Sequence, residues 1–337
     1  MQEQLADAIQ ALFSDHATPA AVRRAQQAGL DRALWRLLAD AGFDRALAPE
    51  SSGGSGLALR DVGAVLQACG RFAAPVPLGE SMLAHAVAGT CGATLPDGVF
   101  SAATARVQGD HVFANVVPWG TSADWVLALE PDRHAWVLPV VGATVASHPG
   151  LGACNEADMQ WRLQDAQAEF ALPAGLDWLA AGAALRTAQI AGALDTVLEM
   201  TLRHANDRSQ FGRPLAKFQA IQQQIALLAE DAFATRMSAA VATDSATVLP
   251  DSKAAAAGKV VASAAAVRAC GIAHAVHGAM GITAEHDLQL FTRRLLAWRV
   301  QYGSEAYWAQ QLGQALMADS VPMWDFVRAT GRPVAQS

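Results

Sequence analysis

Cysteine is scarce in this sequence, and its shortage excludes two classes of small-site chemistry. The 337 residues include four cysteines, none of which forms a C-x-x-C pair. The sequence therefore indicates neither a disulfide framework nor a zinc site, and we expect reduced, structural thiols. They are Cys69, Cys91, Cys154 and Cys270.

Charge is scarce as well. Charged residues make up 16% of the chain, the formal net charge is −7, and no run of Lys or Arg stands out. A nucleic-acid-binding surface needs concentrated positive charge, so we expect no nucleic-acid partner. Any anionic ligand must instead be bound by individual Arg or Lys side chains.

Long apolar runs are also missing. No uninterrupted run reaches the length of a membrane span, and the N-terminal Met-Gln-Glu-Gln lacks the basic segment and apolar core of a signal peptide. We therefore expect a cytoplasmic protein without membrane insertion.

Apolar residues, by contrast, are abundant at 52% of the chain, and alanine is frequent among them. A chain of this length exceeds one ordinary core. Its composition favours helices that bury more than one face, as in a large bundle or an oligomer.

The pattern of apolar and polar residues changes twice along the chain and divides it into three parts. Residues 1–98 show helical periodicity and predict an N-terminal helical domain. Residues 99–172 contain short strand-like runs around a Gly109-Asp110 turn and predict a small middle β domain. Helical periodicity returns over 173–320 and predicts a C-terminal bundle with four or five long helices, followed by a loosely ordered tail at 321–337. The expected fold is mainly α with a small β unit.

One segment has the content of a dinucleotide site. Arg208 stands beside a break between helices and is followed by Phe211 and Gly212. A guanidinium binds pyrophosphate bidentately, and an aromatic ring covers an adenine. An Arg in this position is also a common helix-end cation, so the neighbouring motifs decide between the two interpretations.

Those neighbours resemble the acyl-CoA dehydrogenases. Residues 208–231, RSQFGRPLAKFQAIQQQIALLAED, are similar to the family's R-x-Q-F-G-x-P-L-x-x-F-Q-x-x-Q segment. Residues 277–285, HGAMGITAE, resemble its H-G-G-x-G-Y-T-x-E loop, and Gly303-Ser304 stands where the family has Gly-Thr. With similar motifs between Leu34 and Leu57, the resemblance covers nearly the whole chain.

The resemblance implies the family's fold, with a helical domain, a β domain and a C-terminal four-helix bundle, and FAD bound between subunits. Arg208, Gln210 and Phe211 would hold the ADP part, and Gly278 and Ala279 of a neighbouring subunit would approach the pyrophosphate. It further implies an acyl-CoA substrate, an electron-transfer flavoprotein as acceptor, and Ser304 in place of the cofactor-site threonine.

A metal site is an alternative interpretation of the histidines at the start of the 277–285 loop and just before it. His274 and His277 are three residues apart, but no carboxylate shares their helix face. We therefore expect no metal.

The family's base is where the resemblance fails. Removing a proton α to a thioester needs a carboxylate beside it, usually a Glu. Counting from Arg293 puts Tyr302 on that position, and a second position used by some members is Gly182. Glu305 is the nearest carboxylate, either as a substitute base or as an acid at a helix N-terminus.

Three hypotheses follow. The chain is a non-catalytic subunit that completes the FAD site of a heteromer, as in the short, base-lacking subunits of bacterial enzymes of steroid side-chain degradation. Alternatively, it is a self-sufficient homo-oligomeric dehydrogenase with Glu305 as base, or a flavin-free scaffold that keeps the fold for protein contacts.

Overall fold

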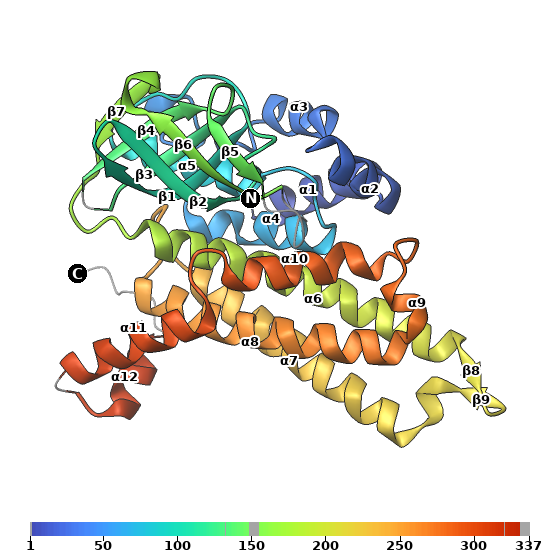
Figure 1. Ribbon diagram of the computed structural model, residues 1–337. Coiled ribbons are helices and arrows are strands. Elements are labelled where there is room, and N and C mark those ends of the chain that lie inside the picture. Colours follow the sequence, from blue (N-terminus) through green and yellow to red (C-terminus); the bar gives the residue numbers. More distant parts are fainter. Residues whose placement is uncertain (1, 132, 148–154, 320, 331–337) are drawn as a thin grey trace. The chain divides into compact units, whose positions relative to one another are not determined.

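The computed structural model describes residues 2–131, 133–147, 155–319 and 321–330, which fall into two compact units (Figure 1). The first comprises Met1–Val62, Ala74–Gly182 and Ala246–Leu249. The second comprises Gly63–Ala73, Ala183–Ser245 and Pro250–Ser337. Two of the crossings between the units lie inside helices, α4 (Leu59–Arg71) and α6 (Trp178–Asp207).

The first unit begins with helices whose starts follow local capping rules. The Thr18 hydroxyl accepts a hydrogen bond from the Ala21 N–H, and the Asp31 carboxylate accepts from the N–H groups of Ala33 and Leu34. One later helix carries mostly apolar and small residues on all of its faces, and it is consequently buried on all sides over most of its length. These helices are α1 (Gln2–His16), α2 (Pro19–Ala28), α3 (Arg32–Asp40) and the buried α5 (Leu78–Thr90).

A seven-stranded mixed sheet completes the first unit, in the order β5-β6-β2-β1-β3-β4-β7. Its strands are β1 (Phe100–Gln108), β2 (His111–Val117), β3 (Trp125–Leu129), β4 (His134–Pro139), β5 (Thr144–Ser147), β6 (Ala157–Arg162) and β7 (Ala168–Ala171). The predicted hairpin at Gly109-Asp110 is confirmed, because Gln108 pairs with His111 across it. β1 and β3 are parallel, and the other neighbours are antiparallel.

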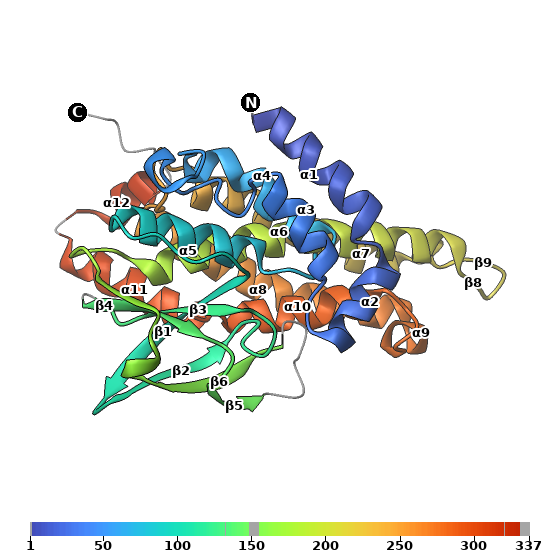
Figure 2. The same ribbon diagram turned by 90° about the horizontal axis from the view of Figure 1, so that it is seen from above.

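The second unit is a helical bundle built around α8 (Ser252–His277). Figure 2 shows α7 (Gln219–Thr243), α10 (Leu288–Val300) and α11 (Glu305–Ala318) alongside it, and all three pack on it. α8 is long and apolar enough to cross a membrane, but it has the packing of a central bundle helix. The short α9 (Ala279–Ile282) precedes α10, and α12 (Met323–Thr330) ends the described chain.

Two glycines let α4 and α6 approach closely within the second unit. A Cβ added at Gly70 would lie 1.8 Å from the Gln189 carbonyl oxygen, and one at Gly192 would lie 1.9 Å from the Gln67 oxygen. Any side chain at either position would therefore push the backbones apart.

The predicted fold class is confirmed, as are the long helices, which number five between residues 177 and 317. Cys69, Cys91 and Cys270 take part in no disulfide among the described residues, and Cys154 lies outside those residues. The expectation of a loosely ordered tail was wrong for residues 323–330, because Phe326 is buried and Lys253 Nζ lies 4.6 Å from the centre of its ring. The domain boundaries at 98, 172 and 320 stay predictions.

Candidate functional site

The predicted dinucleotide motif forms a short hairpin at the end of α6. Strands β8 (Ser209–Gln210) and β9 (Arg213–Pro214) pair, and the Leu215 N–H donates to the Arg208 carbonyl at 2.9 Å. Phe211 stands at the tip with a left-handed φ of 52° and an exposed fraction of 91%. Its ring is therefore open to a flat ligand or a partner.

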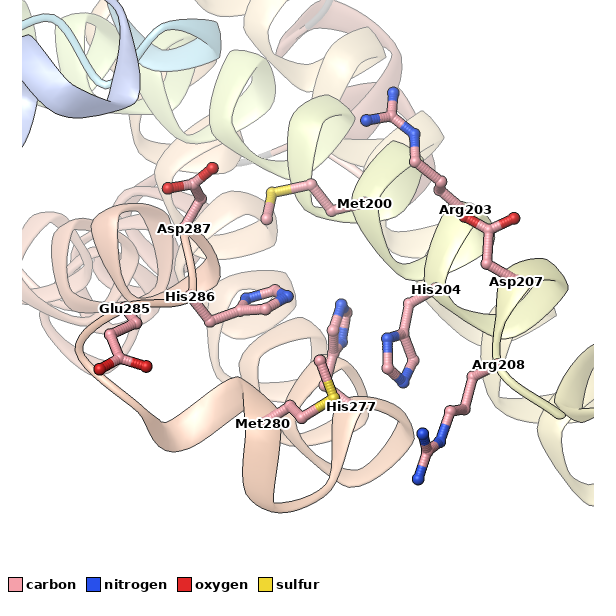
Figure 3. A pocket seen from close by; sticks show the side chains of 10 residues that line it. All are labelled: Met200, Arg203, His204, Asp207, Arg208, His277, Met280, Glu285, His286 and Asp287. Atoms are coloured by element: carbon pink, nitrogen blue, oxygen red, sulfur yellow. The ribbon is translucent and has the colours of Figure 1, made fainter. Parts of the chain in front are cut away.

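A cavity of about 450 Å³ lies beside this hairpin, entirely within the second unit (Figure 3). Residues of α6 and its end form one wall, and residues from the end of α8 to the start of α10 form the other. It is lined by Met200, Arg203, His204, Asp207, Arg208, His277, Met280, Glu285, His286 and Asp287. The structure thus brings Arg208 together with His277 and Met280 of the same chain. Gly278 and Ala279, which the resemblance assigned to a neighbouring subunit, lie between these two residues in sequence and do not line the cavity.

Gly278 and Ala279 link α8 to α9. Gly278 has a left-handed φ of 59°, its N–H donates to the His274 carbonyl at 2.9 Å, and a Cβ added there would meet nothing within 4 Å. What Gly278 offers a ligand is therefore its lack of a side chain. Ala279 is the first residue of α9.

Three histidines, His204, His277 and His286, stand in a row in this cavity, and none of them was predicted as a site residue. The ring centres of His204 and His277 are 4.4 Å apart and stacked, and those of His277 and His286 are 5.0 Å apart (Figure 3). The sequence did carry a signal, because His204 precedes Arg208 by one helical turn and shares its face.

Burial keeps two of these rings neutral. It lowers the pKa of His277 to about 4, and it also lowers the pKa of His204, with further contributions from His286 and Arg208. His277 Nδ1 lies 2.8 Å from the Ala273 carbonyl, while His274 Nε2 faces the Thr292 hydroxyl at 3.1 Å. Across the described ranges, no three His, Cys, Asp or Glu side chains are placed to hold a metal ion.

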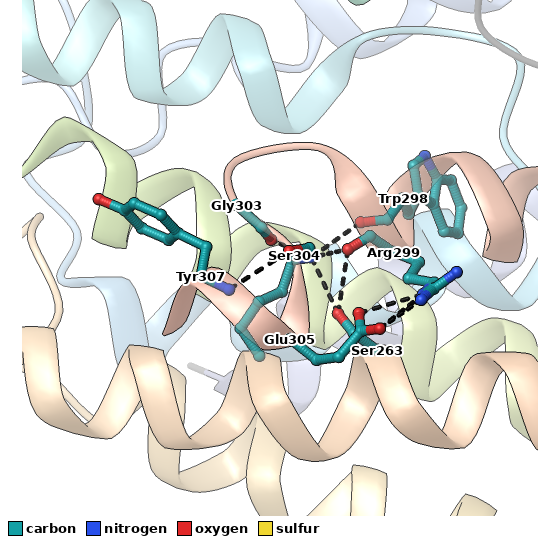
Figure 4. Close-up of polar contacts among 8 residues, drawn as sticks. Ser263, Trp298, Arg299, Gly303, Ser304, Glu305 and Tyr307 are labelled. Carbon is teal, nitrogen blue, oxygen red and sulfur yellow. Dashed lines mark hydrogen bonds and ion pairs between the residues drawn. The ribbon is translucent and has the colours of Figure 1, made fainter. Parts of the chain in front are cut away.

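Ser304 and Glu305 lie elsewhere, at the turn that follows α10 and at the first residue of α11 (Figure 4). The 13 residues of α10 separate this turn from the cavity, a length of about 20 Å at 1.5 Å per residue. The Ser304 hydroxyl accepts a hydrogen bond from the Tyr307 N–H and caps α11. The structure therefore does not bring these two residues to Arg208.

Tyr302, which the sequence predicts at the family's base position, packs on a buried cation. The Arg186 guanidinium lies 5.3 Å from the centre of the Tyr302 ring, and Arg186 Nε donates to Gln301 Oε1 at 2.7 Å. Tyr302 itself has a left-handed φ of 54°. Its ring thus takes part in a cation–π contact inside the bundle.

Glu305 is the first residue of α11, and its carboxylate is bound by Arg299. Arg299 Nε donates to both carboxylate oxygens, at 3.0 and 3.1 Å, and Nη2 donates as well (Figure 4). These hydrogen bonds are the largest cause of a lowered pKa for Glu305. A carboxylate held in this way is a weaker base than a free one.

Lys259 of α8, which sequence reasoning missed, organises this turn. Its side chain is 0% exposed, and its ammonium donates to Ser263 Oγ at 3.0 Å. It also donates to three backbone carbonyls, those of Trp298, Arg299 and Gly303, at 3.0, 2.7 and 2.9 Å. Burial, followed by the Arg186 charge, lowers the pKa of Lys259 to about 7.

Lys259→Met is expected to lower the free energy of unfolding by about 2 kcal/mol at pH 7, because the carbonyls of Trp298 and Gly303 lose the Lys259 donor and that of Arg299 keeps only Ser263 Oγ. Between pH 7 and 10.5 the unfolded wild type binds more protons at Lys259 than the folded one, so wild-type stability rises with pH. The gap between wild type and variant should therefore widen from pH 7 to pH 10 in urea unfolding. Lys253→Met, which removes an exposed lysine of the same helix, should show no such widening.

Comparison with known proteins gives matches over both helical parts of the chain. A model of the acyl-CoA dehydrogenase C-terminal domain matches residues 176–317, and a model of the N-terminal domain matches residues 1–94. Acyl-CoA dehydrogenase IpdE2 of Mycobacterium tuberculosis is 32% identical over 303 residues, which cover 87% of this chain and 90% of that protein.

Two solved structures are similar over almost their whole length. A Tcur3481-Tcur3483 steroid ACAD, solved as a variant, has a TM-score of 0.81 and 26% identity, with coverage of 94% of this chain and 99% of that one. The ChsE4-ChsE5 complex from M. tuberculosis has a TM-score of 0.77 and 22% identity, with coverage of 95% and 98%.

Proposed function

The chain belongs to the acyl-CoA dehydrogenase family of FAD-dependent oxidoreductases acting on CH–CH groups, and on this premise we propose that it is the non-catalytic subunit of a heteromer. In this role it completes an FAD site, while another subunit supplies the base for α,β-dehydrogenation of an acyl-CoA. When bound, FAD accepts the hydride that leaves the β carbon.

Arg208 in the cavity wall and three residues near it, Gln210, Phe211 and Gly278, suit the ADP part of FAD. Arg208 offers a guanidinium for the pyrophosphate, and Gly278 leaves open space beside the chain. The exposed Phe211 ring offers a stacking surface for adenine, and Gln210 precedes it on β8. In this proposal these residues bind and orient the cofactor, and Ser304 takes the place of the family threonine.

The proposal rests on the residues found at or near the two positions where the family has its catalytic base. Tyr302 packs against Arg186, and the carboxylate of Glu305 is bound by Arg299. The second position, Gly182, has no side chain. The turn is thus built as a structural element, with Lys259 bound to its carbonyls and Glu305 paired at the start of α11.

The relatives support a heteromer and a substrate class. The two structural neighbours carry paired names, Tcur3481-Tcur3483 and ChsE4-ChsE5, and the first is called a steroid ACAD. We accordingly propose a homologous acyl-CoA dehydrogenase subunit as partner, a CoA thioester of a steroid side chain as substrate, an electron-transfer flavoprotein as acceptor, and a cytoplasmic location.

Glu305→Gln tests the assignment of the base. In the complex with its partner subunit, the variant is expected to reduce flavin within about twofold of the wild-type rate after anaerobic mixing with acyl-CoA. Replacing the partner's base should lower that rate by at least about 100-fold. Glu199→Gln, which breaks an ion pair with Arg71, is the matched control. A loss of 100-fold or more in Glu305→Gln alone would show that Glu305 is the base.

A further inference from the structure

The cavity beside Arg208 holds a buried imidazole nitrogen that no neighbour satisfies. His277 is 4% exposed, and its Nε2 has no hydrogen-bond partner among the residues that the structure describes. Buried polar atoms in proteins are nearly always paired with protein, water or ligand atoms, so an unpaired one in a cavity wall leaves a position that a ligand atom can fill.

The other nitrogen of this ring fixes which partner Nε2 can take. The Ala273 carbonyl can only accept, so His277 Nδ1, at 2.8 Å, carries the proton and donates it. Nε2 then has a lone pair. Because burial lowers the pKa of His277 to about 4, this tautomer stays neutral at physiological pH. The missing partner is therefore a hydrogen-bond donor.

The two walls of the cavity differ in charge. Arg203 and Arg208 come from α6 and its end, next to Asp207, whereas Glu285 and Asp287 come from the segment before α10. Figure 3 shows the three rings in a row between these walls, with His277 in the centre. A ligand that suits both walls is anionic at one end and carries N–H or O–H donors at the other.

A nucleoside diphosphate has this polarity. We propose that His277 is a specificity-determining residue of the cavity, accepting through Nε2 a hydrogen bond from an amino or hydroxyl group of a nucleoside diphosphate bound by Arg208. The inference rests on the proposed function, in which the ADP part of FAD binds in this cavity. It adds that His277 recognises the nucleoside through a hydrogen bond.

Calorimetric titration of the FAD-free complex with the partner subunit tests this with four probes: ADP, inosine diphosphate, 2′-deoxy-ADP and 3′-deoxy-ADP. Inosine diphosphate replaces the amino donor with a carbonyl, and the deoxy compounds each lack one hydroxyl. The wild type is expected to bind one of the three analogues roughly 5- to 100-fold more weakly than ADP, because that analogue leaves Nε2 unpaired.

Two variants assign the discrimination to His277. His277→Leu should bind ADP more weakly by a similar factor and should no longer distinguish ADP from that analogue. His277→Gln keeps an acceptor and should keep the discrimination. If His277→Leu does not fold, the wild-type series and His277→Gln decide.

The failures of the two proposals are distinguishable. The inference is overturned if the wild type binds all four probes equally, or if His277→Leu still discriminates between them. In either case the proposed FAD site is retained as long as ADP binding requires Arg208. If the wild type binds no ADP, or Arg208→Ala binds it unchanged, both proposals are overturned.

Discussion

Replacing Gly192 with alanine is expected to lower the free energy of unfolding by about 3 kcal/mol, and Gly70→Ala by a similar amount. The new Cβ would lie 1.9 Å from the Gln67 oxygen in the first variant and 1.8 Å from the Gln189 oxygen in the second. These neighbours are helix backbone, which cannot rotate away, so α4 and α6 must separate and lose packing along their contact.

Gly313→Ala is the matched control for these variants. Gly313 also lies inside a helix, but a Cβ added there meets nothing within 4 Å. Alanine has the higher helix propensity, so this variant should be more stable by about 0.5–1 kcal/mol. Urea unfolding measures all three. Equal stabilities for Gly192→Ala and wild type would contradict the close helix contact.

Arg208→Ala is expected to weaken FAD retention by the complex by about 10- to 100-fold, the usual loss for a charge-assisted bidentate contact. Flavin absorbance after gel filtration measures it. Arg208→Lys should recover only part of the binding, because an ammonium cannot form the bidentate pair.

Arg236→Ala controls for loss of an arginine as such. Arg236 pairs with Asp195 in the same unit and does not line the cavity. It should retain FAD like the wild type. Undiminished retention in Arg208→Ala would instead support the flavin-free scaffold.

Local features of this fold could be predicted from the sequence, because they depend on neighbouring residues. Gly109-Asp110 forms the predicted turn, and the Asp177 carboxylate accepts a hydrogen bond from the Ala180 N–H just before α6, as is common for an Asp at a helix start. The break between helices at Arg208 is a hairpin with glycine at its tip.

The contacts that give the candidate site its character join residues far apart in the chain. Arg186 meets Tyr302, and Lys259 binds carbonyls about 40 residues away, because tertiary packing of the bundle brings their helices together. Periodicity shows that such residues lie in helices but does not show which faces meet. The row of His204, His277 and His286 was missed for the same reason.

The most direct test of the central claim compares the chain expressed alone with the chain co-expressed with its homologous partner. We predict that only the co-expressed complex retains FAD stoichiometrically and bleaches it on anaerobic mixing with acyl-CoA. A chain that, purified alone, binds FAD and is reduced by acyl-CoA at the rate of the complex would contradict the account.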